Sequence, residues 1–220
     1  MKVQQHLLPL LTLLAAFQAP AHAGQFAFVG TFIHDNDLQL FTFTLGAPST
    51  VTLQTWGYGG GTNAAGQVIP AGGFESVLGI FDSAGTAVSG PIEPGPNPDC
   101  SPRNPDPARF GFCQDAYGQI SLAAGSYIVS LTQFPNDPLG NLSDGFFYIN
   151  TVPDPNFNNG FVGTFGLPGN GNWALDITGV DSAAAAGAVP EPGTLFMGCF
   201  GLAMSMVARR RATRNETRKQ

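Results

Sequence analysis

The segment from Gly24 to Ala188 has almost no basic residues. It contains no lysine, and its only arginines are Arg103 and Arg109, against thirteen acidic residues, which leaves a net charge near −11. Nucleic-acid binding depends on Lys and Arg contacts to phosphate, so nucleic acid is excluded as a partner. Divalent cations suit such a surface better, since they prefer carboxylate oxygens.

Residues for general-base and nucleophilic chemistry are also scarce. His34 is the only histidine in the same segment, and it lies in an acidic turn without a G-x-S-x-G nucleophile motif. The absence of lysine excludes Schiff-base catalysis there. We therefore expect no enzymatic activity. A glycan-acting enzyme with a pair of acids stays as the third alternative.

Apolar and polar residues alternate in several short segments of the body. In LQLFTFTL, Phe41, Phe43 and Leu45 share one face, and the same period recurs in STVTLQT, GSYIVSLTQF and NWALDIT. Further strand candidates are FAFVGTFI, VLGIFD, YGQISL and FVGTF at 161–165, and no sustained helical periodicity is present. The pattern predicts an all-β fold over residues 24–182, an antiparallel β-sandwich of jelly-roll type.

The chain begins with the layout of a secretory signal peptide. Lys2 precedes an apolar run over residues 7–17, and the small residues Ala21 and Ala23 follow it. These features predict a signal peptide over residues 1–23 that signal peptidase cleaves between Ala23 and Gly24. The run is too short to span a membrane easily.

The C-terminal end has a different layout. Small residues at 183–189 predict a linker, and an uncharged apolar run at 193–208 predicts one transmembrane helix. The residues between and after them are Pro190, Glu191, Pro192, Arg209, Arg210 and Arg211. The arginines predict a cytoplasmic tail at 212–220, which places the body outside the inner membrane.

The best metal candidate is the HDNDLQ segment. Asp35, Asn36 and Asp37 offer several oxygens before a strand, and Asp82 and Asp115 lie at other turns or strand ends. Such oxygens suit a structural Ca²⁺ ion, the one cofactor considered. The alternative is that Asp and Asn bond their own backbone in turns.

Two cysteines flank a proline-rich loop. In an oxidising compartment we expect Cys100 and Cys113 to form a disulfide. A metal or redox role has less support because no C-x-x-C spacing is present.

Two loop features have competing interpretations. Trp56, Tyr58, Phe74 and Trp173 would make a sugar-stacking platform if exposed, or would fill the core if buried. The glycine-rich segment 57–66 lacks the lysine of a phosphate-binding loop, so we predict a flexible loop there.

VPEPGTLFMGCFGLAMSMVARRR closely resembles the PEP-CTERM sorting signal of Gram-negative bacteria. The resemblance implies recognition by exosortase, with Pro190, Glu191 and Pro192 marking the processing region and Arg209 to Arg211 holding the tail. It also implies a transient inner-membrane anchor, a periplasmic body, and then the cell surface or matrix. The family is associated with exopolysaccharide and biofilm production.

The body resembles the bacterial pre-peptidase C-terminal domain in HDNDLQLFTFTL, LGIFDSAGTAV and ISLAAGSYIVSL, which occur in that order. This resemblance implies a β-sandwich in a surface setting and no particular activity. Together the two resemblances favour a non-enzymatic envelope or matrix protein. A carbohydrate-binding module is the alternative, and sugar is then the ligand.

Overall fold

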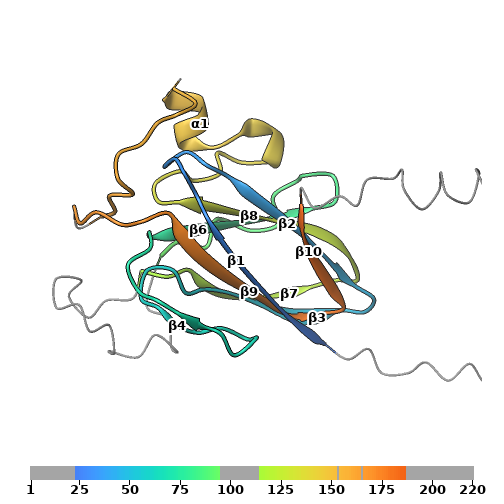
Figure 1. Cartoon of the computed structure of the whole chain (residues 1–220). Helices are drawn as coiled ribbons and strands as arrows, with labels where there is room; N and C mark the ends of the chain where they lie inside the picture. The colour runs from blue at the N-terminus through green and yellow to red at the C-terminus, as the bar shows by residue number, and fades with distance from the viewer. Residues whose placement is uncertain (1–22, 95–113, 153, 165, 187–220) are drawn as a thin grey trace, which may run out of the picture.

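The body is built from two four-stranded antiparallel sheets, as a computed structural model shows for residues 23–94, 114–152, 154–164 and 166–186 (Figure 1). One sheet has the strand order β1-β9-β3-β7, and the other has the order β10-β2-β8-β6. The elements are β1 (Gly24–Thr31), β2 (Gln39–Leu45), β3 (Ser49–Thr55), β4 (Gly61–Thr62), β5 (Val68–Ile69), β6 (Ser76–Asp82), β7 (Tyr117–Leu122), β8 (Gly125–Gln133), the 3₁₀ helix η2 (Leu142–Asp144), α1 (Phe147–Thr151), β9 (Asn172–Val180) and β10 (Ser182–Ala186).

The hydrophobic core lies between the inner faces of the two sheets. On β2, Phe41, Phe43 and Leu45 are buried, and the threonines between them are exposed. The inner faces of β3, β6, β8 and β9 join the same cluster. The alternation read from the sequence is thus confirmed, because successive side chains of a strand point to opposite faces.

Consecutive long strands alternate between the two sheets along the whole described chain. β1, β3, β7 and β9 form one sheet, and β2, β6, β8 and β10 form the other. This arrangement is the antiparallel β-sandwich that the sequence predicts, whereas the jelly-roll type stays a prediction. The short hairpin β4-β5, the helix α1 and η2 lie within the connections (Figure 1).

The linker expected at 183–189 is wrong over its first residues. Ser182–Ala186 form β10, an edge strand that pairs antiparallel with β2, with Ala183 opposite Phe43 and Ala185 opposite Phe41. Alanine has a low preference for strands, so its sequence did not indicate one. The edge of β2 supplies the backbone partners, and the small side chains of Ala183 and Ala185 pack against the core.

The strand expected at 161–165 is also wrong. Phe161 has a φ of 51°, outside the extended region, and residues 161–164 belong to no strand. Carboxylates from elsewhere bind the backbone of this segment: Asp35 Oδ1 accepts the Phe161 amide at 2.9 Å, and Glu75 accepts the Thr164 amide at 3.0 Å. Tertiary hydrogen bonds therefore replace a strand ladder there.

The body lies between the predicted signal peptide and the predicted sorting signal in the sequence. β1 begins at Gly24, next to the predicted cleavage point, and Gly24 pairs with Val180, two residues before β10 begins. Among the described residues, no helix has the length and apolar character needed to cross a membrane. The helix predicted at 193–208 lies outside the described residues.

Candidate functional site

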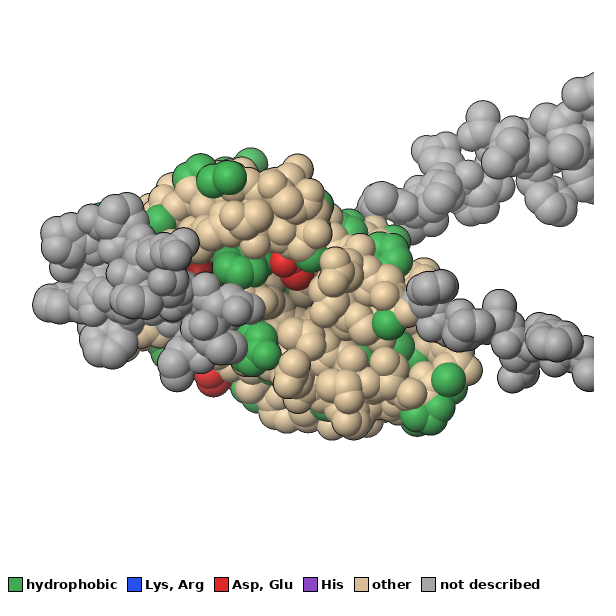
Figure 2. Space-filling model, turned by 90° about the horizontal axis from the view of Figure 1, so that it is seen from below, with side chains coloured by type: hydrophobic (Ala, Val, Ile, Leu, Met, Phe, Trp, Pro, Cys, Tyr) green, Lys and Arg blue, Asp and Glu red, His purple; other side chains and the backbone are tan. Residues whose placement is uncertain are grey.

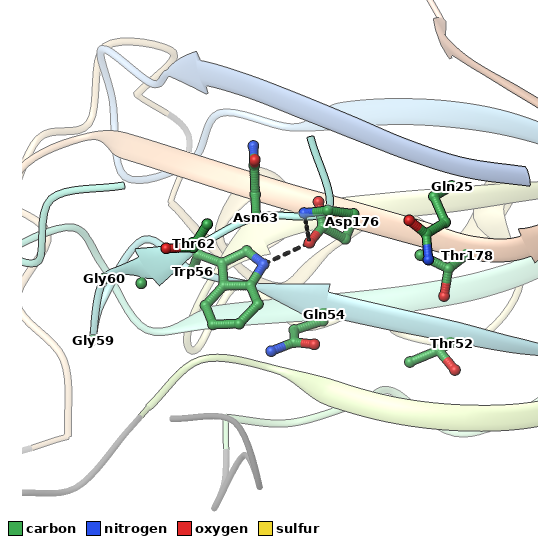
Figure 3. Close-up of a pocket in the computed structure, with 12 residues that line it drawn as sticks. Gln25, Thr52, Gln54, Trp56, Gly59, Gly60, Thr62, Asn63, Asp176 and Thr178 are labelled. Atoms are coloured by element: carbon green, nitrogen blue, oxygen red, sulfur yellow. Dashed lines mark hydrogen bonds between the residues drawn. The ribbon is translucent and has the colours of Figure 1, made fainter. Parts of the chain in front are cut away.

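A polar pocket lies on the outer face of the β1-β9-β3-β7 sheet, where the glycine-rich segment after β3 covers it (Figure 3). Its volume is about 560 Å³. β1, β3 and β9 supply its floor, and the loop supplies one wall. The lining residues are Gln25, Thr52, Gln54, Trp56, Gly59, Gly60, Gly61, Thr62, Asn63, Ala64, Asp176 and Thr178.

The floor of the pocket follows from strand alternation and register. Val51 and Leu53 point into the core, so Thr52 and Gln54 point outward on β3. Gln54 lies directly opposite Asp176 on β9. Directly opposed residues on neighbouring strands have Cβ atoms about 5 Å apart, which brings these two side chains into one site.

Asp176 fastens the loop to the sheet. Its Oδ2 accepts a hydrogen bond of 2.7 Å from the Trp56 indole Nε1 and one of 2.8 Å from the Ala64 amide (Figure 3). Burial raises the pKa of the Asp176 carboxyl, and these two hydrogen bonds act in the opposite direction. The glycine-rich segment is therefore held in place, although its sequence predicts a flexible loop.

A second buried carboxylate fixes the start of the same loop. Asp115 accepts the Tyr58 amide at 3.0 Å, the Gly59 amide at 2.7 Å and the Thr55 hydroxyl at 3.1 Å. Burial raises the pKa of Asp115 to about 6, despite the opposing effect of these hydrogen bonds. Asp115 thus acts as a structural anchor behind the pocket.

Two buried polar atoms in the pocket have no hydrogen-bond partner among the described residues. They are Gln54 Nε2, a donor, and Asp176 Oδ1, an acceptor. Gln54 is 7% exposed and Asp176 is 4% exposed. Buried polar atoms are nearly always paired, so an unpaired donor and acceptor on opposed residues are unusual.

The residues predicted to bind calcium do not form one cluster. Each carboxylate accepts backbone amides instead. Asp37 and Asp82 bind local amides, of Ile33 and His34 and of Ala84 and Thr86, whereas Asp35 binds the distant amides of Asn159 and Phe161 and Asp115 binds those of Tyr58 and Gly59. Asn36 donates to the Asp154 carbonyl. In the part of the chain that the structure describes, no group of three or more His, Cys, Asp or Glu side chains is arranged to hold a metal. Calcium binding stays a prediction, and the role these oxygens have in the structure is to fix turns.

Of the two interpretations of the aromatic residues, burial holds and the exposed platform does not, because Trp56, Tyr58, Phe74 and Trp173 are all buried. Phe74 stacks on Phe32 with ring centroids 5.2 Å apart, and Trp173 packs edge-on against Phe41. Of the four, only Trp56 reaches the pocket, where it forms part of the lining.

Several predicted residues lie outside the described part of the chain. They are Cys100, Cys113, Pro190, Glu191, Pro192, Arg209, Arg210 and Arg211. The disulfide therefore stays a prediction. The signal cleavage between Ala23 and Gly24 is likewise untested by the fold.

The sequence predicted no site here, only the orientation of some side chains that line the pocket. The alternation of STVTLQT placed Thr52 and Gln54 on the polar face of β3, and that of NWALDIT placed Asp176 away from the core. Nothing in the sequence indicated that Gln54 and Asp176 are neighbours, because the β3-β9 pairing joins distant segments.

The surface around the pocket carries no cationic side chain among the described residues, which include neither lysine nor arginine. Figure 2 shows one face of the molecule, on which hydrophobic side chains are scattered and the few charged side chains in view are acidic. The body therefore has no patch of cationic side chains in its described part.

Comparison with known proteins identifies the C-terminal end. Residues 188–211 match the model of the PEP-CTERM protein-sorting motif. No curated protein matches the chain. The chain thus carries the signal of an exported protein that exosortase sorts, with transient membrane anchoring before display at the surface.

Proposed function

We propose that this chain is a non-enzymatic protein of the cell envelope or extracellular matrix, acting in biofilm or exopolysaccharide association. The observation that carries the proposal is the PEP-CTERM match at residues 188–211, at the end of a chain with one β-sandwich body. The motif accounts for delivery, and the acidic sandwich is the part delivered.

The proposed route begins with export and loss of residues 1–23 to signal peptidase. The apolar segment 193–208 then holds the chain in the inner membrane, with the arginines on the cytoplasmic side and the body in the periplasm. Exosortase processes the tail near Pro190, Glu191 and Pro192, and the body passes to the surface or matrix.

The body is proposed to be similar to the pre-peptidase C-terminal domain. Support comes from its antiparallel two-sheet architecture and from the position of the matching segments on β2, β6, β7 and β8. Such a similarity concerns the fold and brings no activity with it.

The chemistry of the pocket supports a non-enzymatic role. Among the described residues that line it, Asp176 is the only carboxylate, and none is histidine, lysine, arginine or cysteine. Glycoside hydrolysis commonly uses two carboxylates that flank the scissile bond. Binding therefore fits the pocket better than catalysis.

The test is a triple substitution, Pro190→Ala, Glu191→Ala and Pro192→Ala, in the producing bacterium. We expect the full-length form to accumulate in the inner-membrane fraction, because the processing signal is lost. Glu216→Ala, outside the matched residues, serves as the matched control and should leave processing unchanged. Normal tail removal and surface delivery of the triple variant would contradict the proposal.

A further inference from the structure

We propose that the pocket between the glycine-rich loop and the β1-β9-β3-β7 sheet binds an uncharged sugar unit of a glycan, through Gln54 and Asp176. The inference deepens the proposed matrix association by giving it a binding site, and it rests on that function for its biological setting.

The pocket contains one hydrogen-bond donor and one acceptor that have no partner among the described residues. Gln54 Nε2 and Asp176 Oδ1 lie on directly opposed residues, and both side chains are more than nine-tenths buried. A hydroxyl group both accepts and donates hydrogen bonds, so the hydroxyls of a sugar can supply the partners that these two atoms lack. A sugar offers several such hydroxyls on neighbouring carbons.

The rest of the lining is mostly polar and uncharged. Thr52 and Thr178 provide hydroxyls beside the opposed pair, and Gln25 provides an amide at the edge (Figure 3). These uncharged groups both donate and accept hydrogen bonds. The Trp56 indole adds an apolar surface, which suits the C–H face of a sugar ring.

The lining suits other ligand classes poorly. An anion would face the Asp176 carboxylate with no cationic side chain among the described lining residues. A calcium ion needs six to eight oxygens, usually with several carboxylates among them, and Asp176 is the only carboxylate among the described lining residues. An apolar ligand would leave the unpaired polar atoms buried without partners.

The size of the pocket agrees with this ligand. Its volume of about 560 Å³ lies within the range of about 300 to 1,000 Å³ that is usual for small-molecule sites. The Trp56–Asp176 and Ala64–Asp176 hydrogen bonds keep the wall and floor together, so the pocket is formed before a ligand arrives.

The experiment measures binding of the full chain to two probes, neutral dextran and exopolysaccharide extracted from the producing bacterium. Gln54→Ala and Gln54→Leu remove the donor without breaking a hydrogen bond of the fold, so the melting temperature should stay within about two degrees. We expect each to weaken binding at least tenfold. Gln39→Ala, on the opposite sheet, is the matched control and should bind as the parent does.

Three results would overturn the inference: neither probe binds the parent, the Gln54 variants bind as well as the parent, or dextran sulfate is preferred to dextran. The localisation test of Pro190, Glu191 and Pro192 is independent of this pocket. Correct sorting without glycan binding would therefore reject the pocket inference and leave the proposed function standing. Failure of sorting with intact binding would do the reverse.

Discussion

The Trp56 indole Nε1 donates a 2.7 Å hydrogen bond to Asp176 Oδ2, across 120 positions of the chain. This bond joins the start of the glycine-rich loop to the central strand β9. Both residues are buried, Trp56 at 7% exposure and Asp176 at 4%. The contact thus couples the stability of the sheet to the shape of the pocket.

Trp56→Phe should lower the free energy of unfolding by about 2 kcal/mol more than Trp173→Phe, as measured by urea denaturation. Both substitutions remove part of a buried indole. Only the first breaks a hydrogen bond to a carboxylate, since Trp173 Nε1 has no partner among the described residues. Equal losses for the two variants would show that the Trp56–Asp176 bond contributes nothing to stability.

Asp115 should make the body less stable as the pH rises from about 4 to about 6. Its pKa is raised from 3.8 to about 6 by burial, so in this window the folded state binds more protons than the unfolded state. The raised pKa of Asp115 contributes about 3 kcal/mol to the free energy of unfolding. This contribution is fully present below pH 4 and is lost as the pH rises through 6.

The measurement for Asp115 is the free energy of unfolding at a series of pH values, for the parent and for Asp115→Asn. The substitution removes the titrating group, so the parent should lose about 3 kcal/mol more than the variant between pH 4 and pH 7. Parallel pH profiles for the two proteins would contradict the raised pKa.

Asp35→Ala should destabilise the body by about 2 to 3 kcal/mol. The carboxylate is 1% exposed and accepts the Asn159 and Phe161 amides, which would be left without partners. We also expect faster proteolysis within residues 154–164. Asp154→Ala is the control, since that exposed carboxylate accepts one local amide, and its effect should stay below about 1 kcal/mol.

Ala185→Asp should cost about 2 kcal/mol, and Ala184→Asp should be nearly neutral. Ala185 packs against the core opposite Phe41, and Ala184 points to solvent on the same strand. Burying a carboxylate without a partner is unfavourable. Thermal melting of the two variants measures the difference, and equal melting temperatures would show that β10 is not docked on β2 in solution.

The main strands could be predicted because their side chains alternate with a period of two. The alternation of Phe41, Phe43 and Leu45 with threonines indicates which face of β2 is buried. The alternation of Leu175 and Ile177 does the same for β9. β10 could not be predicted, because an alanine run has no such alternation. Its conformation depends on the edge of β2, which the local sequence does not encode.

The candidate site was only partly predictable for a similar reason. Alternation assigns Gln54 and Asp176 to outward faces, but their opposition depends on which strands pair and in what register. The carboxylates of the predicted metal set can be identified in the sequence, but the amides that they bind cannot. Asp35 looks like a turn residue with spare oxygens, yet it holds an amide of a segment 126 positions away.

The same five residues occur twice in this chain, and the described residues of the two copies differ in conformation. FVGTF occurs at 28–32 and again at 161–165. The first copy runs through the end of β1, where β9 pairs with its backbone, and residues 161–164, the described part of the second copy, are in no strand. The sequence by itself determined the alternating strands, the acidic charge and the sorting tail, because these depend on local order and composition. Only the tertiary structure decided the conformation of residues 161–164 and the pocket at Gln54 and Asp176, because both depend on hydrogen bonds between residues far apart in the chain.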